Sequence, residues 1–251
     1  MTLGCAALRP ATTPLRTVDL ARSAPSASSA PADDRGGQGG HGARCLAVLL
    51  PGRLDEPEQF ERAGFARAVA SRGLAIDLVA VDSHLGYFRA RSIVERLRTD
   101  VIAPARAAGY DTIWIVGTSL GGLGGLLYLR DHPEDLAGVL ALAPYLGETA
   151  VIEEIERAGG PGQWQAPPTI AESDVGRELW SWLATWPGDG PPVPLHLGWG
   201  AADDFARSNR LLAGLLPPEQ VYTIAGGHDW RVWERLWEGF LDRTRLCAAQ
   251  S

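Results

Sequence analysis

The chain has 251 residues, of which 45% are apolar, and this is enough to form one sizeable hydrophobic core. Its formal net charge of -7 provides no basic surface for nucleic acid or for anionic lipid. All 23 basic residues are arginine, which excludes a lysine Schiff base, a lysine phosphate clamp and a serine–lysine pair. We therefore expect one acidic domain without a nucleic-acid partner, and the composition leaves its oligomeric state open.

The cysteines and histidines are few and scattered. Cys5, Cys45 and Cys247 are too few and too far apart for a disulfide framework or a zinc site, so we expect free thiols. The five histidines include no HxxxH or HxH pair, and we predict neither a metal site nor a cofactor. No stretch is long and apolar enough to span a bilayer.

Residues 1–43 are predicted to form a disordered tail or tether. Proline, serine, alanine and glycine dominate residues 23–42, which cannot bury enough apolar surface to become ordered. Deleting residues 1–40 should leave thermal stability unchanged, unless residues 12–20 add an edge strand. Residues 3–5 (LGC) resemble the end of a bacterial lipoprotein signal without the segments that precede one. The location is therefore left open between the cytoplasm and an exported lipoprotein whose start lies upstream of Cys5.

From residue 44 onward, strand and helix patterns alternate. Apolar, β-branched runs predict strands over residues 44–50, 75–81, 112–116, 138–143, 194–199 and 220–225. Helical spacing of apolar residues predicts helices over residues 58–72, 91–107, 120–129, 205–215 and 230–246. This alternation predicts an α/β fold with a doubly wound, mostly parallel sheet and with function at the carboxyl ends of its strands.

Residues 147–192 interrupt this rhythm with glycines and paired prolines. We interpret them as a short helical insertion over the strand ends, within a domain that spans residues 44–251. The insertion holds four of the nine tryptophans: Trp164, Trp180, Trp182 and Trp186. Two uses are equally consistent with this cluster, namely the apolar underside of a lid and an anchor to the body of the domain.

A serine stands between a predicted strand and a predicted helix, in the sequence Gly117-Thr118-Ser119-Leu120-Gly121. This G-x-S-x-G pattern needs glycines because a strand that turns straight into a helix leaves no room for side chains. The turn also places the serine hydroxyl at a helix N-terminus, which favours developing negative charge. A plain glycine-rich turn or a phosphate-binding loop is the alternative, and the strand before and the helix after favour a nucleophile.

A nucleophilic serine needs a base and a carboxylate at the same sheet edge, and two later strand ends supply them. Asp203 follows the strand at 194–199, and His228 follows the strand at 220–225. Asp204 is a rival for Asp203 because both lie on one turn, and Glu148 is a more distant rival. His84 also follows a strand end, where we expect a structural hydrogen bond, with pocket lining as the alternative.

The order Ser, Asp, His and the sequence G-G-H-D-W at 226–230 resemble an α/β-hydrolase of the serine esterase kind. The histidine loop is similar to that of bacterial putative esterases and the enterochelin-esterase-like group. The resemblance covers nearly all of the chain from Cys45 onward. It implies that Ser119 is the nucleophile, Asp203 the acid and His228 the base.

The oxyanion hole implied by this resemblance consists of the backbone N–H groups of Leu120 and Arg53. The chain departs from many relatives at Pro51-Gly52, where they have His-Gly, so the shape of this loop is the least determined part of the site. The implied activity is hydrolysis of a small-molecule carboxylic ester, with thioesters as further substrates. Acyltransferase or peptidase chemistry, and a non-catalytic binding protein on the same scaffold, are the alternatives.

Overall fold

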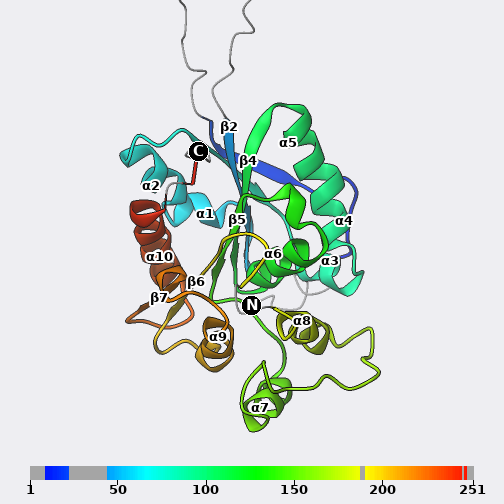
Figure 1. Ribbon diagram of the computed structural model, residues 1–251. Coiled ribbons are helices and arrows are strands. Elements are labelled where there is room, and N and C mark those ends of the chain that lie inside the picture. The colour runs from blue at the N-terminus through cyan, green and yellow to red at the C-terminus, as the bar shows by residue number, and fades with distance from the viewer. Residues whose placement is uncertain (1–8, 23–43, 187–189, 245, 248–251) are drawn as a thin grey trace, which may run out of the picture.

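A seven-stranded sheet forms the centre of the molecule (Figure 1). The computed structural model describes residues 9–22, 44–186, 190–244 and 246–247. The strand order is β1-β3-β2-β4-β5-β6-β7. The strands are β1 (Thr17–Ala21), β2 (Arg44–Leu50), β3 (Ile76–Val81), β4 (Tyr110–Thr118), β5 (Gly138–Leu142), β6 (Leu195–Gly200) and β7 (Val221–Ile224). All neighbouring pairs are parallel except β1 with β3, so the mostly parallel α/β sheet is confirmed.

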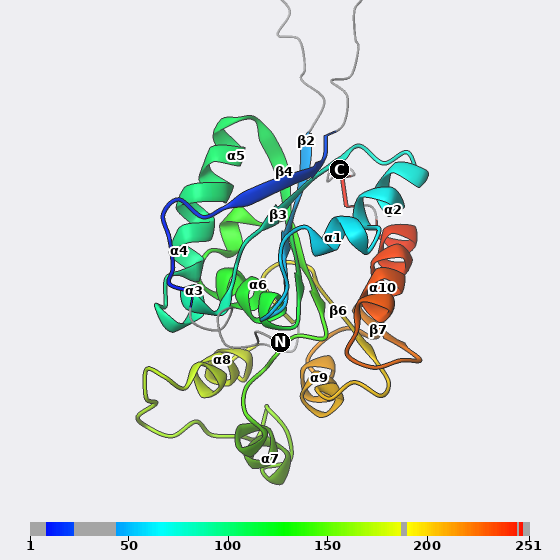
Figure 2. The ribbon, with the colours of Figure 1, turned by 180° about the vertical axis from the view of Figure 1, so that it is seen from behind.

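Helices cover both faces of the sheet, which is why the central strands are buried along nearly their whole length and are mostly apolar. One face carries α1 (Gln59–Arg62), α2 (Phe65–Ser71) and α10 (Trp230–Arg243) (Figures 1 and 2). The other carries α4 (Ile93–Leu97), α5 (Ala103–Ala107) and α6 (Leu120–Asp131), with a π-helical turn at Arg98–Ile102 between the first two. The helix predicted over 58–72 is divided at Gly64, which has a φ of 82° and is the N-cap of α2.

The carboxyl ends of the parallel strands carry the remaining helices (Figure 1). These are α3 (Leu85–Arg89), α7 (Thr149–Arg157), α8 (Val175–Leu183) and α9 (Ala206–Ala213). Short 3-10 turns at Pro133–Asp135 and Pro218–Gln220 precede β5 and β7. No helix within the described ranges is long and apolar enough to cross a membrane.

The N-terminal prediction is wrong for residues 17–21, which form the edge strand β1 instead of a tail. The segment before it is fastened to the carboxyl edge of the sheet, because the buried Asp82 accepts hydrogen bonds from Arg9 and Arg16. Leu15 is 4% exposed and belongs to the main core. Composition alone did not predict these contacts, because a strand of five residues is short and because Asp82 lies far away in the sequence. The predicted tail over 23–43 lies outside the described residues.

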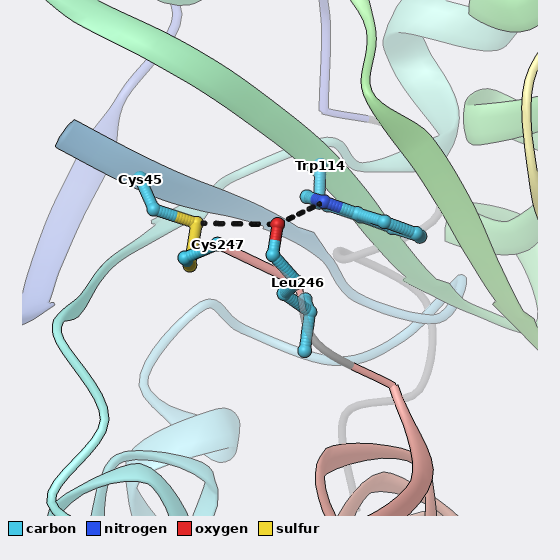
Figure 3. The surroundings of a disulfide bond; sticks show 4 residues. All are labelled: Cys45, Trp114, Leu246 and Cys247. Carbon is cyan, nitrogen blue, oxygen red and sulfur yellow. Dashed lines mark hydrogen bonds between the residues drawn. A yellow bond between two sulfur atoms is a disulfide. The ribbon is translucent and has the colours of Figure 1, made fainter. Parts of the chain in front are cut away.

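The prediction of free thiols is also wrong for two of the three cysteines. Cys45, in β2, forms a disulfide with Cys247, which follows α10 (Figure 3). Their separation of 202 residues hid the pairing, which arises because α10 runs back to the edge where β2 begins. Next to it the Trp114 indole N–H donates to the carbonyl oxygen of Leu246 at 3.0 Å (Figure 3). Cys5 lies outside the described residues.

In the segment predicted to form an insertion, residues 147–192, one tryptophan bonds to the body of the domain. Trp180 of α8 is fully buried, and its indole N–H donates to the carbonyl oxygen of Leu146 at 2.8 Å. Trp164 donates to Glu154 of α7 at 2.9 Å. Among the described residues that line the cleft beneath the insertion there is no tryptophan. The anchoring use is therefore supported for Trp180, whereas Trp164 joins two parts of the predicted insertion.

Candidate active site

Ser119 stands on a strained turn between β4 and α6. Its φ of 51° lies in the left-handed region, which is costly for a residue with a side chain and which persists only when surrounding contacts impose it. Those contacts are backbone hydrogen bonds: Ser119 N–H donates to the Leu142 carbonyl at 2.9 Å, and Tyr145 N–H donates to the Ser119 carbonyl at 3.0 Å. The turn is thus fixed to β5 and to the loop that follows it.

The flanking glycines are required by close approach of the backbone. A Cβ atom on Gly117 would lie 2.2 Å from the carbonyl oxygen of Gly121. A Cβ atom on Gly121 would lie 2.0 Å from the carbonyl oxygen of Leu50 in β2. Both separations are far inside van der Waals contact with rigid backbone, so the turn excludes side chains at both positions.

Asp203 and His228 are in hydrogen-bond contact. The His228 Nδ1 atom lies 3.0 Å and 2.9 Å from the two carboxylate oxygens of Asp203. The Asp203 side chain is fully buried, whereas that of His228 is 23% exposed. The Phe205 N–H donates to Asp203 Oδ1 at 2.8 Å and fixes the carboxylate. A carboxylate accepts only, so we assign the proton to Nδ1 of the neutral ring, and Nε2 is the free basic nitrogen.

Aromatic side chains connect the histidine to the serine turn. The His228 ring meets Phe205 and Trp233 edge-to-face, each with a centroid distance of 4.9 Å. Phe205 in turn packs edge-to-face on Tyr145 at 5.6 Å, and Tyr145 holds the Ser119 carbonyl. These contacts span the carboxyl ends of β4 to β7.

The three predicted site residues are therefore gathered at one sheet edge, with different degrees of contact. Asp203 and His228 are bonded directly. Ser119 and His228 both belong to the described residues, and the Ser119 hydroxyl forms no hydrogen bond with the His228 ring. Catalytic hydrogen bonds in ligand-free structures are often long and tighten only when substrate binds.

The predicted oxyanion residues lie beside the serine. Leu120 is the first residue of α6, so its backbone N–H has no partner inside the helix. Arg53 lies in the loop after β2, next to Gly52, where an added Cβ would be 3.6 Å from the Ser119 Cβ. This loop also reaches the histidine side, since Trp230 donates to Asp55 at 3.1 Å.

The rival residues occupy other positions. Asp204 is exposed, and Glu148 accepts a hydrogen bond from the Tyr145 hydroxyl at 2.7 Å. Burial raises the pKa of Tyr145, and the bond to Glu148 raises it further, so this tyrosine stays a neutral donor. The structural role expected for His84 is confirmed, because its Nδ1 accepts the Gly86 N–H at 3.1 Å as the N-cap of α3. Burial lowers the pKa of this imidazole.

One group of potential metal ligands lies outside this site. His132, Glu134 and Asp135 follow α6 and place ligand atoms within 4.8 Å of one another. Tyr128 already donates to Asp135 at 2.7 Å, and His132 lies 3.4 Å from Glu134. These mutual contacts explain the cluster without an ion.

A cleft of about 780 Å³ opens beside the serine turn, and sequence reasoning did not find it. Its lining includes Leu120, Tyr145 and Glu148 near the turn, together with residues of α3, α4, α6 and α8. The leucine spacing over residues 120–127 could have indicated the cleft, but the same spacing is typical of a helix that is packed in the core. Ser119, Asp203 and His228 do not line this cleft themselves.

No protein-family model matches the chain, and no curated protein sequence matches it. Among solved structures, a ferulic acid esterase is 18% identical, with a TM-score of 0.57 over 81% of this chain and 86% of that chain. The S-formylglutathione hydrolase FrmB of Staphylococcus aureus is 15% identical, with a TM-score of 0.57 over 80% of each chain. The fluorophosphonate-binding serine hydrolase FphF of Staphylococcus aureus is 12% identical, with a TM-score of 0.55 over 91% of this chain and 98% of that chain. At such identities the likeness establishes the fold, and this chain has the α/β-hydrolase fold.

Proposed function

We propose that the protein is a serine hydrolase that cleaves carboxylic esters through an acyl-enzyme. One observation carries the proposal: the buried Asp203 holds Nδ1 of His228 at the sheet edge where Ser119 occupies its strained turn. A buried carboxylate that orients a partly exposed imidazole beside a serine is the arrangement that acyl transfer requires. Among the structures of similar fold, one is called a ferulic acid esterase and another an S-formylglutathione hydrolase, which agrees with this reaction class.

The mechanism follows from these positions. The Ser119 oxygen attacks the carbonyl carbon while Nε2 of His228 takes the hydroxyl proton, and Asp203 balances the charge on the imidazolium. The negative oxygen of the tetrahedral intermediate accepts hydrogen bonds from the N–H groups of Leu120 and Arg53. His228 then gives its proton to the leaving alcohol, whose bond to the carbonyl carbon breaks. A water molecule, deprotonated by the same nitrogen, releases the acid and restores Ser119.

Thioesters undergo the same steps with a better leaving group, so thioester hydrolysis belongs to this proposal as a second activity. Transfer of the acyl group to an alcohol or amine, and peptide cleavage, use the same triad. The remaining alternative is a binding protein that keeps the fold without catalysis. The strained φ of Ser119 favours an enzyme, because strain of this kind is characteristic of functional sites.

The neighbouring aspartates provide the test with a matched control. Asp203→Asn should lower kcat for p-nitrophenyl acetate by about four powers of ten, because the amide no longer fixes the tautomer of His228 or balances its charge. Asp204→Asn, at an exposed position, should lower kcat by less than about tenfold. The purified variants are compared with the wild type once thermal unfolding has shown that all three proteins have the same melting temperature. Equal rates in all three proteins would contradict the triad, and loss only in the Asp204 variant would move the acid to that residue.

A further inference from the structure

A stripe of leucines leads away from the nucleophile along one wall of the cleft. Leu120, Leu123 and Leu127 of α6 all line it, and their spacing of three and four residues places them on one face of the helix. Leu120 directly follows Ser119. With a rise of about 1.5 Å per residue, the stripe extends over roughly 10 Å from the first leucine to the last.

Four further apolar side chains, from α3 and α4, line the cleft: Leu85, Phe88, Ile93 and Val94. The segment before α8 lines it as well and is polar, with Glu172, Ser173 and Asp174. The cleft measures about 780 Å³, which lies within the range of small-molecule sites. Ser119 does not line the cleft itself, so an apolar chain attached to it would enter past Leu120 and continue along these two groups of apolar side chains.

Charged groups close the far end of the cleft. Arg130, three residues beyond Leu127 on the same helix, forms an ion pair with Glu178 of α8 at 2.9 Å. Arg91 pairs with the other oxygen of Glu178 at 2.8 Å. All three side chains line the cleft. Burying a methyl end against these charges would remove water from them, so the ion pairs and Leu127, which precedes them on α6, together limit the length of an apolar occupant.

The position of His228 determines which half of an ester enters the cleft. His228 must protonate the leaving alcohol, so the alcohol lies on the histidine side of Ser119. That side is formed by the loops before α9 and α10, whereas α6 and α8 lie on the other side of the sheet edge (Figures 1 and 2). Neither His228 nor Ser119 lines the cleft, but Leu120, which directly follows Ser119 on the α6 side, does, and we therefore assign the acyl group to the cleft.

We propose that the cleft between α6, the α3–α4 segment and α8 binds the acyl chain of the substrate. The substrate class is then an ester of an extended, uncharged acid whose chain is about as long as the leucine stripe, roughly 10 Å. Leu123 and Leu127 are the specificity-determining residues. This inference rests on the proposed ester hydrolysis and adds the identity of the acyl group.

The test is a series of p-nitrophenyl esters from acetate to dodecanoate, hydrolysed by the wild type and by cleft variants. The wild type should gain kcat/KM as the chain lengthens and lose it once the chain exceeds the stripe. Leu127→Trp fills the distal half, so kcat/KM for the longest preferred esters should fall about tenfold or more relative to kcat/KM for acetate. Leu123→Trp should restrict the enzyme to the shortest esters. Leu127→Ala should extend the preference to longer chains.

Leu74→Trp is the matched control, because Leu74 is half-buried before β3 at the opposite edge of the sheet and does not line the cleft. It should leave the chain-length profile of the wild type unchanged. Alkyl acetates of increasing alcohol length form a second series, and the dependence of kcat/KM on alcohol length should be the same in all variants. An unchanged acyl profile in the Leu127 variants, or a shift confined to the alcohol series, would overturn the acyl assignment. If the wild type hydrolysed no ester at all, the proposed function itself would fail instead.

Because Leu127 is 7% exposed, tryptophan there has to enter the cleft or disturb the fold. Thermal unfolding distinguishes the two cases. Should Leu127→Trp fail to fold, Leu127→Ala decides the question alone, since it only enlarges the cleft. An alanine variant that folds and keeps the wild-type length limit would contradict the proposal.

Discussion

Breaking the Cys45–Cys247 disulfide should lower the stability of the protein by several kcal/mol. The bridge closes a loop with a sequence separation of 202 residues, so it removes much conformational freedom from the unfolded chain. The loop-entropy relation gives about 5 kcal/mol at 25 °C for this length, and removal of native disulfides typically costs about 2–5 kcal/mol. For a domain of this size, the corresponding fall in melting temperature is about 4–20 °C.

The assay is thermal unfolding of the wild type with and without a thiol reductant, beside the double variant Cys45→Ser, Cys247→Ser. The reduced wild type and the double variant should melt together, and the reductant should not affect the double variant. Ester hydrolysis well below the transition should be equal in all samples, because the bridge lies at the edge where β2 begins and the candidate site at the edge where it ends (Figure 1). Alkylation of both cysteines in the untreated native protein, or identical melting curves with and without reductant, would refute the reasoning.

Two further predictions concern the serine turn and the edge strand. Gly121→Val should abolish soluble folding as well as activity, because its side chain would meet the Leu50 carbonyl, and recovery of a soluble, active variant would argue against the strained turn. Deleting residues 1–22 should lower the melting temperature, since it removes β1 and leaves the buried Asp82 without its arginine partners. Leu15→Ala in the full chain should produce part of the same loss, about 2–5 kcal/mol for a buried leucine, and an unchanged denaturation midpoint would show that the segment does not stabilise the fold.

The parallel sheet and the serine turn were predictable because their causes are local in sequence. Strands buried on both faces must be apolar throughout, and the turn at Ser119 needs glycine on both sides. Asp203 and His228 could be located for a related reason. In a parallel sheet every strand end points to one edge, so residues that follow different strands meet there without any sequence signal between them.

The features that sequence reasoning missed depend on distant contacts. β1 buries its side chains only in part, and the segment before it is held by ion pairs from Arg9 and Arg16 to Asp82, far along the chain. The disulfide depends on where α10 ends relative to β2, which no local pattern encodes. The cleft is lined by helices that are far apart in the sequence, α3, α4, α6 and α8, while its leucine stripe has the same spacing as an ordinary core helix.

The central claim is that Ser119 is a nucleophile activated by His228, and covalent labelling tests it most directly. A fluorophosphonate probe phosphonylates a serine only where a base removes its proton and an oxyanion site stabilises the adduct. Intact-mass measurement should show one adduct per chain, peptide mapping should place it on Ser119, and Ser119→Ala and His228→Ala should abolish it while melting like the wild type. Absence of labelling on the folded wild type, or an adduct on another serine, would contradict the account.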